Sequence, residues 1–269
     1  MPTVARFSTT PVKGTALHHP DRLQVTTDGV RENRRFHLVD ARGRLFNGKH
    51  HGPLVQLTAR YDEGTGRLAL SFPGRDAPLE GTPEPGAAVT TDFYGRPVPG
   101  RLVTGPWAEA LSGFVGEPVR LVAVDTPGAG VDVHPVTLVS TATLDHLRSV
   151  TPGGEQLDHR RFRMLVEIDG CGAFEEDTWA GRGLQVGGAT VRVVGPVPRC
   201  VVTNQSPVDG DVDFGTLKAV VAARGRRSSD LTTPVAHLPD GGAVVLGVYA
   251  TVEAPGAVAL GDAVEVLEG

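Results

Sequence analysis

Cys200 is a candidate for metal ligation or nucleophilic chemistry. It ends the segment GPVPRC at residues 195–200, directly after the predicted strand ATVRVV. The two prolines restrict φ to about −65° and remove two backbone donors, so the segment is stiff and holds the cysteine in a set direction. Arg199 beside it favours the thiolate, the form that binds metals and attacks electrophiles. The alternative is a buried, unreactive cysteine beside a surface arginine, because free cysteines are among the most buried residue types.

The cysteine count limits the kinds of site that the chain can build. Cys171 and Cys200 are the two cysteines in 269 residues, and they do not form a C-x-x-C pair. A disulfide framework and a zinc or iron–sulfur centre built from cysteines are therefore excluded. One or two free thiols remain.

Glu175, Glu176 and Asp177 form the other dense group of reactive side chains. Adjacent carboxylates raise one another's pKa, so one of them can donate a proton in a reduction. A solvated turn before Trp179 explains the same residues without a catalytic role. Both interpretations stay open on these residues alone.

A nucleotide-binding loop is rejected. Residues 43–50, GRLFNGKH, fit the pattern G-x-x-x-x-G-K, but His50 then stands where Ser or Thr would hold magnesium. Gly52 and Pro53 also argue against the helix whose N-terminus would hold phosphates. Lys49 can still face a bound anion.

The elements that must position these residues are mostly short strands. Thirty-five glycines and 21 prolines are scattered along the chain, which favours tight turns and short strands over long helices. Alternation of apolar and polar residues predicts strands in the first part at 35–40, 53–61, 67–72 and 96–105. A helix is predicted at 106–116, with Pro106 near its first turn and Gly116 past its end.

From about residue 120 onward the chain forms a second unit. Ser140 or Thr141 can cap a helix there. The patterns further predict a buried strand at 161–170, a hairpin at 183–195 and closing strands at 242–269. We therefore expect a mainly β protein with a few helices, in two β-rich units at 1–120 and 121–269, the second one barrel-like.

Composition and charge narrow the function. Hydrophobic residues make up 40% and charged residues 21%, as in an ordinary globular protein. The formal net charge of −5 argues against a general nucleic-acid binder, although local basic clusters can still hold a small anion. No apolar run approaches the ~20 residues that span a bilayer, and the start lacks the apolar core of a secretory signal. We expect a cytoplasmic protein without nucleic-acid or membrane partners.

Several ordered motifs resemble one known family. VGPVPRCVVT at 194–203 resembles the cysteine-bearing motif of the MOSC domain, the C-terminal module of molybdenum cofactor sulfurases. The stretches 160–193 and 247–266 resemble other segments of that domain, including its Arg-Phe-Arg segment and its acidic E-D-x-W segment. In the first half, TPVKG, RRFHLVD and LFNGKHHGPLVQL look like the β-barrel domain that precedes MOSC in amidoxime-reducing proteins. The resemblance covers nearly the whole chain.

The resemblance implies a molybdenum cofactor of the molybdopterin type, with Cys200 as the metal ligand. Molybdenum bound by dithiolene sulfur accepts a further soft thiolate, and cationic side chains suit the terminal phosphate of the pterin. Asp177 matches the family's acidic segment and is, with Cys200, the expected catalytic residue. The expected cofactor-binding residues come from both halves: Lys13, Arg35, Lys49, Arg163, Arg199 and Thr203.

Two departures from the amidoxime-reducing proteins bear on the pocket. Gly14 replaces a serine after the lysine, so one hydroxyl contact is absent. Met164 and Leu165 replace Pro-Asn, so a cofactor-binding amide is absent as well. The pyridoxal-phosphate domain of the sulfurases has no counterpart, so we expect activity independent of pyridoxal phosphate.

The leading hypothesis is an enzyme that reduces N-hydroxylated or N-oxide small molecules by oxygen-atom transfer at molybdenum. No flavin, haem or iron–sulfur motif is visible, so an external electron-transfer protein or reductase is required. One alternative is a sulfur carrier that holds a persulfide on Cys200, since the thiolate argument serves that role equally well. Another is a non-catalytic module that stores or delivers the cofactor.

Overall fold

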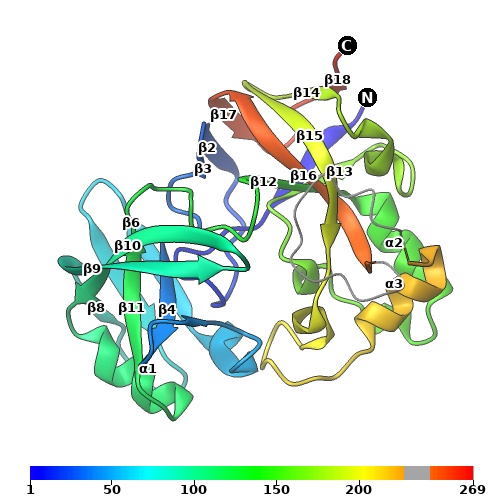
Figure 1. Cartoon of the computed structure of the whole chain (residues 1–269). Coiled ribbons are helices and arrows are strands. Elements are labelled where there is room, and N and C mark those ends of the chain that lie inside the picture. The colour runs from blue at the N-terminus through cyan, green and yellow to red at the C-terminus, as the bar shows by residue number, and fades with distance from the viewer. Residues whose placement is uncertain (227–242, 269) are drawn as a thin grey trace.

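The chain folds into two β-rich units with three α-helices in its described residues, 1–226 and 243–268 of the computed structural model (Figure 1). The expected class, mainly β with a few helices, is confirmed. Gly242 and Gly269, the two ends of the predicted closing strands, lie outside the described residues.

The first unit is built on a five-stranded antiparallel sheet of order β5–β4–β11–β10–β9. Its strands are β4 (Phe36–Asp40), β5 (Leu45–Phe46), β9 (Glu84–Phe93), β10 (Arg96–Thr104) and β11 (Val119–Val124). A second sheet holds β6 (Thr58–Asp62), β7 (Arg67–Ser71) and β8 (Leu79–Gly81), and the short 3-10 helix η1 (Gly52–Gln56) precedes it. Burial alternates along β7, as the apolar–polar pattern predicts, whereas β4 is buried on both faces.

Helix α1 (Trp107–Val115) closes the core of the first unit. Pro106 precedes it and Gly116 ends it in a left-handed conformation, as predicted. Trp107 is fully buried, and its indole N–H donates to the Leu79 carbonyl oxygen at 3.0 Å. The ring therefore fastens α1 to the β6–β8 sheet, and burial of each such large side chain stabilises the fold by about 1.5–3 kcal/mol.

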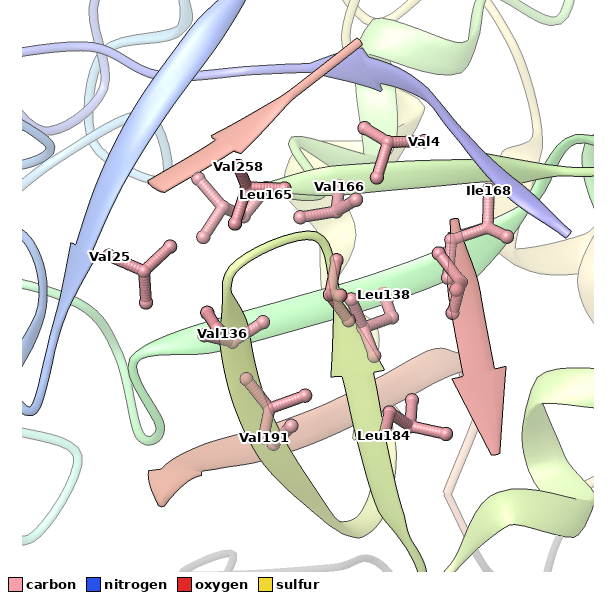
Figure 2. Close-up of a cluster of buried hydrophobic side chains, with 14 of the residues drawn as sticks. Val4, Val25, Val136, Leu138, Leu165, Val166, Ile168, Leu184, Val191 and Val258 are labelled. Atoms are coloured by element: carbon pink, nitrogen blue, oxygen red, sulfur yellow. The ribbon is translucent and has the colours of Figure 1, made fainter. Parts of the chain in front are cut away.

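The second unit is a seven-stranded sheet of order β1–β13–β12–β16–β15–β14–β18. Its strands are β1 (Thr3–Phe7), β12 (Val136–Ser140), β13 (Val166–Asp169), β14 (Gly183–Val186), β15 (Ala189–Pro198), β16 (Val245–Ala254) and β18 (Val264–Val266). A bridge between Thr3 and Ala263 joins the two outer strands, so the sheet nearly closes into a barrel. Figure 2 shows its interior, which is packed with valine, leucine and isoleucine side chains.

Two helices cover the second unit. Helix α2 (Thr141–Val150) begins after Ser140, whose side chain accepts the Thr143 N–H at 2.9 Å and caps it as predicted. Helix α3 (Thr216–Arg224) packs beside it. Four 3-10 turns complete this unit: η2 (Gly154–Gln156), η3 (His159–Phe162), η4 (Glu175–Trp179) and η5 (Val201–Asn204). None of the helices within the described ranges combines the length and apolarity needed to cross a bilayer.

The two units are interwoven rather than consecutive. Strand β1 comes from the start of the chain but pairs with β13 in the second unit. A small sheet joins β2 (Arg22–Thr26) and β3 (Gly29–Val30) to β17 (Gly256–Ala259), near the other end of the chain. The proposed boundary at 120–121 falls inside β11, which pairs with β4 and β10.

Three local predictions differ from the structure. Residues 53–61 are not one strand, because η1 occupies 52–56 and β6 begins only at Thr58. Pro53 does not prevent a helical turn there: it occupies the first turn of η1, where its missing N–H costs nothing. Residues 161–170 are likewise divided between the end of η3 and strand β13.

Candidate functional site

A cavity lies between the two units and is lined by residues of both. Its lining is rich in basic and aromatic side chains: Lys13, Gly14, Arg34, Asn47, Gly48, Lys49, Val55 and Tyr94 from the first unit, and Val131, Asp132, His134, Pro135, Thr137, Arg161, Phe162, Arg163, Met164, Leu165, Val197, Pro198, Arg199, Cys200, Val202, Thr203, Gln205 and Tyr249 from the connector and the second unit. Cavities at the junction of two units are common binding sites.

Cys200 is an exposed free thiol in this lining. It follows the end of β15 at Pro198 and stands before the turn η5. Thr203 holds its backbone, because the Thr203 N–H and hydroxyl donate to the Cys200 carbonyl oxygen at 3.1 and 2.9 Å. The stiff segment predicted from the two prolines therefore leads into a fixed turn, and the inert, buried alternative for this cysteine does not apply.

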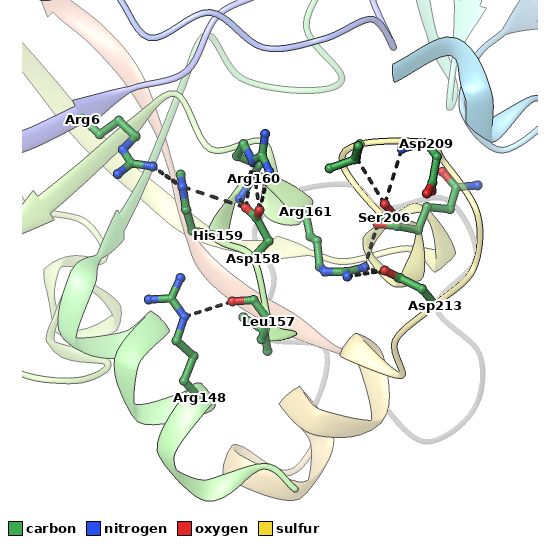
Figure 3. A network of polar contacts seen from close by, with 12 residues as sticks. Arg6, Arg148, Leu157, Asp158, His159, Arg160, Arg161, Ser206, Asp209 and Asp213 are labelled. Carbon is green, nitrogen blue, oxygen red and sulfur yellow. Dashed lines mark hydrogen bonds and ion pairs between the residues drawn. The ribbon is translucent and has the colours of Figure 1, made fainter. Parts of the chain in front are cut away.

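The turn η3 contains Arg160 and Arg161, which belong to a network of polar contacts (Figure 3), and Arg161 lines the cavity. Its N-cap is Asp158, which accepts the Arg160 N–H at 2.8 Å. Arg161 is buried and donates to both carboxylate oxygens of Asp213, at 2.7 and 2.8 Å, and to the Gln205 carbonyl oxygen at 2.8 Å. This bidentate contact fixes the loop that follows η5 against the cavity wall.

Two arginines reach the cavity from left-handed backbone positions. Arg163, which ends η3, has φ of 51°, and Arg34 has φ of 53°. The Arg163 guanidinium donates to the Thr15 carbonyl oxygen at 2.7 Å, and Arg34 donates to the Arg163 carbonyl oxygen at 3.3 Å. Side chains other than glycine rarely adopt this conformation, and such residues gather at functional sites. The contacts also join the two units directly.

Lys13 and Asp132 form an ion pair within the lining. The Lys13 ammonium lies 2.6 Å from the Asp132 carboxylate and donates to the Gly130 carbonyl oxygen at 3.2 Å. Burial lowers the pKa of Lys13 to about 8, although Asp132 opposes this shift. Burial alone would raise the pKa of Asp132, but Lys13, Arg34 and Lys49 together lower it to about 2. The carboxylate is therefore ionised at neutral pH.

Lys49 and Tyr94 are two residues of the first unit that line the cavity together. The Lys49 ammonium lies 4.5 Å from the centre of the Tyr94 ring. The Tyr94 hydroxyl accepts the Asn47 amide at 3.0 Å, and Asn47 in turn accepts the Lys49 backbone N–H at 2.9 Å. Burial raises the pKa of both Tyr94 and Tyr249, so the two phenols stay protonated.

The cavity carries more positive charge than its own groups neutralise. The described lining holds six cationic side chains and one carboxylate, Asp132; of the six, Arg161 is also paired with Asp213 outside the lining. Burial lowers the pKa of Arg34, of Arg199 and, to about 9, of Arg163, with Arg34 adding to the effect on Arg163. A depressed pKa means that the protein stabilises these charges less than water does. An anionic ligand would supply the missing compensation.

Unpaired polar atoms in the lining agree with a bound group. The Nε atoms of Arg161 and Arg199, Nε2 of His134 and Oε1 of Gln205 are buried and have no hydrogen-bond partner. Such atoms are rare in folded proteins, and each calls for an explanation. A soft thiol, excess cations and spare donors together match a phosphate-bearing cofactor whose metal accepts sulfur, so the residues present fit the expected molybdopterin.

The cavity includes most of the residues predicted from the sequence. The predicted residues that line it are Cys200, Lys13, Lys49, Arg163, Arg199 and Thr203. Arg35 does not line the cavity: its guanidinium donates to the Val124 carbonyl oxygen. Its neighbour Arg34 lines the cavity instead, because the left-handed turn at Arg34 separates the directions of the two side chains.

Asp177 also lies outside the cavity lining. Its carboxylate pairs with Arg224 of α3, whose guanidinium lies 4.7 Å from the centre of the Phe174 ring. The expected role of Asp177 as a proton donor to a substrate in this cavity is therefore not supported. The residue joins η4 to α3 instead.

The lining residues that were not predicted include Arg34, Asp132, His134 and Tyr249. Asp132 and His134 lie in the connector between the units, where no periodic pattern marks them. Tyr249 lies on β16, and the His134 ring packs edge-on against it with centres 5.3 Å apart. The sequence signal for Tyr249 is its position in the stretch 247–266, which resembles a segment of the MOSC domain.

The two departures in the pocket have structural consequences. Gly14 has φ of 97°, a conformation that a serine would adopt only with strain. Met164 is 3% exposed and accepts an N–H of Arg199 on its sulfur at 3.3 Å, while Leu165 belongs to the barrel core. Gly14 therefore presents backbone to the cavity, and Met164 and Leu165 present apolar side chains, where the amidoxime-reducing proteins have polar ones.

The nearly closed barrel and the cation-rich cavity with its free thiol define a two-unit β protein with a cofactor-type site. The chain belongs to the MOSC domain family. Residues 125–265 match the model of the MOSC domain, and residues 1–116 match that of the MOSC N-terminal beta barrel domain. The two matches leave between them residues 117–124, which contain β11.

Curated relatives extend over nearly the whole chain. The chain is 26% identical to mitochondrial amidoxime reducing component 2 of Bos taurus, covering 97% of this chain and 82% of that protein. It is 24% identical to mitochondrial amidoxime-reducing component 1 of Homo sapiens, covering 98% and 83%. Among solved structures, the YUAD protein from Bacillus subtilis matches at 12% identity and a TM-score of 0.43, covering 99% of this chain and 96% of that one.

Proposed function

We propose that this protein binds a molybdopterin-type cofactor through Cys200 and reduces N-hydroxylated or N-oxide small molecules with electrons from a separate protein. The observation that carries the proposal is the exposed Cys200 thiol in a cavity ringed by under-compensated cations from both units. The names of the relatives, amidoxime reducing components, support the same kind of substrate. The excess of positive charge favours this proposal over a persulfide carrier, because a single persulfide needs fewer compensating cations than a phosphate-bearing cofactor.

Cationic side chains and the Cys200 thiolate would hold the cofactor. Arg34 and Arg163 reach the same cavity, and Lys13 and Lys49 line it as well. These cations would bind the terminal phosphate and the anionic sulfur groups. Thr203 would keep the Cys200 backbone in place through its two hydrogen bonds. Bound molybdenum would supply oxygen-atom transfer.

The overall reaction balances with an external donor. Reduction of an N-hydroxyl group consumes two electrons and two protons and releases the oxygen as water. The protonated phenols of Tyr94 and Tyr249 keep hydroxyl donors in the cavity, since burial raises the pKa of each. The apolar surfaces of Met164, Phe162 and Val197 exclude water from the inner wall.

Turnover with a small chemical donor tests the proposal without a partner protein. Protein produced in a host that makes the cofactor is mixed with reduced methyl viologen and either benzamidoxime or an aromatic N-oxide. We expect viologen oxidation that depends on the substrate, and none with Cys200→Ala. Persulfide on Cys200 by mass spectrometry, with no turnover and no pterin, would favour the sulfur-carrier alternative instead.

A further inference from the structure

Exposed apolar side chains gather just after Cys200 in the chain. Val201, Val208 and Val212 are 57%, 65% and 75% exposed. We call these three residues the valine surface. Elsewhere in the described ranges, the large apolar side chains with comparable exposure are scattered: Met1, Tyr94, Val150, Leu260 and Leu267. Single exposed apolar residues are ordinary, whereas three in one short segment beside a cavity indicate an interaction surface.

The valine surface adjoins the cavity through the backbone. Val201 follows Cys200 directly. Val212 forms an isolated β-bridge with Gln205, which lines the cavity, and the Val208 N–H donates to the Ser206 hydroxyl at 3.2 Å. A protein seated on these valines would therefore lie beside the cavity and its thiol.

The segment that carries the valine surface is held at several points. Arg161 clamps Asp213, as Figure 3 shows, and the Ser206 N–H donates to the Asp211 carbonyl oxygen at 2.7 Å. From the first unit, the Gln56 amide donates to the Asp209 carbonyl oxygen at 2.9 Å. The surface is therefore preformed, and a partner would lose little conformational entropy in binding it.

Negative charge alternates with the apolar side chains. Residues 208–213 read VDGDVD, and Asp209, Asp211 and Asp213 are all exposed. The Asp213 carboxylate is engaged by the buried Arg161, while Asp209 and Asp211 add exposed negative charge next to Val208 and Val212 in the chain. Exposed valines interspersed with carboxylates complement a partner that carries lysines and arginines around its own apolar patch.

We propose that the valine surface is the docking site of the electron-donating protein, a small redox protein whose exposed prosthetic group is surrounded by apolar and basic residues. The inference rests on the proposed function, which requires an external donor. Docking here places the prosthetic group next to the residue that follows the metal ligand. Electron-transfer encounters are small and transient, and charge complementarity steers them.

Cytochrome c is a suitable probe because lysines surround its exposed haem edge. Holoprotein reduced with dithionite and then freed of it is mixed with oxidised cytochrome c, and haem reduction is followed by stopped flow. Each two-electron centre reduces two cytochromes. We expect Val208→Asn/Val212→Asn and Asp211→Asn each to lower the second-order rate constant about tenfold, a difference of about 1.4 kcal/mol. The rate should fall steeply with added salt in the wild-type protein.

Matched substitutions elsewhere on the surface serve as controls. Val150→Asn and Leu260→Asn remove apolar side chains of similar exposure, and Asp145→Asn removes an exposed charge on α2. All variants should keep wild-type turnover with reduced methyl viologen. Equal cytochrome rates in surface and control variants, with normal viologen turnover, would overturn the docking site alone. Absence of viologen turnover in the wild-type protein would overturn the proposed function, and the docking site with it.

Discussion

The two cysteines of this chain lie in opposite environments. Cys200 is exposed in a cavity whose other charged groups are mostly cations. Cys171 is half-buried near Glu175 and Glu176, and burial together with these carboxylates raises its pKa to about 11. A thiol with so high a pKa is a poor nucleophile and metal ligand at neutral pH. The two cysteines are therefore distinguished by their surroundings rather than by residue type.

The carboxylates near Cys171 serve the fold rather than the cavity. Glu176 is fully buried, and one of its carboxylate oxygens accepts the Thr143 hydroxyl at 3.0 Å. Burial raises its pKa above the ordinary value. Asp177 pairs with Arg224 on the neighbouring helix α3. These carboxylates join η4 to α2 and α3, whereas the cations around Cys200 line the cavity.

Removal of each thiol in turn should give opposite results for the two cysteines. Cys200→Ala should lose essentially all molybdenum, since the variant removes the metal's thiolate ligand. Cys171→Ala should retain the wild-type content, because that thiol faces packed protein. Elemental analysis of the two purified variants measures the effect. Equal molybdenum in both would contradict the assignment of Cys200.

Thiol reactivity against pH sharpens the contrast. In the Cys200→Ala background, alkylation of Cys171 by iodoacetamide should be slow at pH 7 and should rise about tenfold per pH unit up to pH 9, because the thiolate fraction grows as the pH approaches a pKa of about 11. Mass spectrometry of timed samples gives the rate. A rate that levels off below pH 9 would show that Cys171 is not held as a neutral thiol.

Removing a cavity cation should weaken cofactor binding without weakening the fold. Arg163→Met deletes a charge whose pKa is lowered to about 9, mainly by burial, and also the hydrogen bond to the Thr15 carbonyl oxygen; because these two effects oppose each other, the cofactor-free protein should keep its melting temperature. Cofactor affinity should fall about tenfold, as for other groups around a metal centre. Titration of cofactor-free protein with released pterin tests this, and Arg224→Met, outside the cavity, is the control. A fall in stability without a change in affinity would make Arg163 a structural residue.

The smallest effect is expected from Glu176. Because its folded pKa is raised, its contribution to stability is complete only below the unfolded pKa and declines as pH rises through the folded pKa. Glu176→Gln removes this loss. The free energy of unfolding of the variant should therefore rise relative to that of the wild-type protein between pH 4 and pH 8. Denaturant titrations at both pH values measure it, and a constant difference would show that Glu176 does not titrate abnormally.

Sequence motifs located the site better than they located individual side chains. Cys200, Lys13, Lys49, Arg163, Arg199 and Thr203 all line the cavity, since each stands in a motif with fixed local geometry. The motif predicted Arg35 rather than Arg34. It does not reveal that Arg34 adopts a left-handed backbone conformation, and so it does not show which of the two side chains lines the cavity. Asp132 depends on the path of the connector between the units, which no short-range pattern encodes.

The fold class followed from composition and alternation, but the division of the chain did not. Strand β1 belongs to the second unit and β11 to the first, and only tertiary pairing decides such exchanges. The helix ends were predictable, because Ser140 and Gly116 act through local backbone contacts. Long-range pairing, by contrast, leaves little trace in neighbouring residues.

The most direct test of the account is the ratio of molybdenum and pterin to protein in freshly purified material from a cofactor-producing host. Molybdenum is measured by elemental analysis, and pterin by fluorescence after denaturation. The account predicts close to one molybdenum and one pterin per chain, both absent from Cys200→Ala. Protein that carries neither, although the same host loads another molybdenum enzyme, would contradict it.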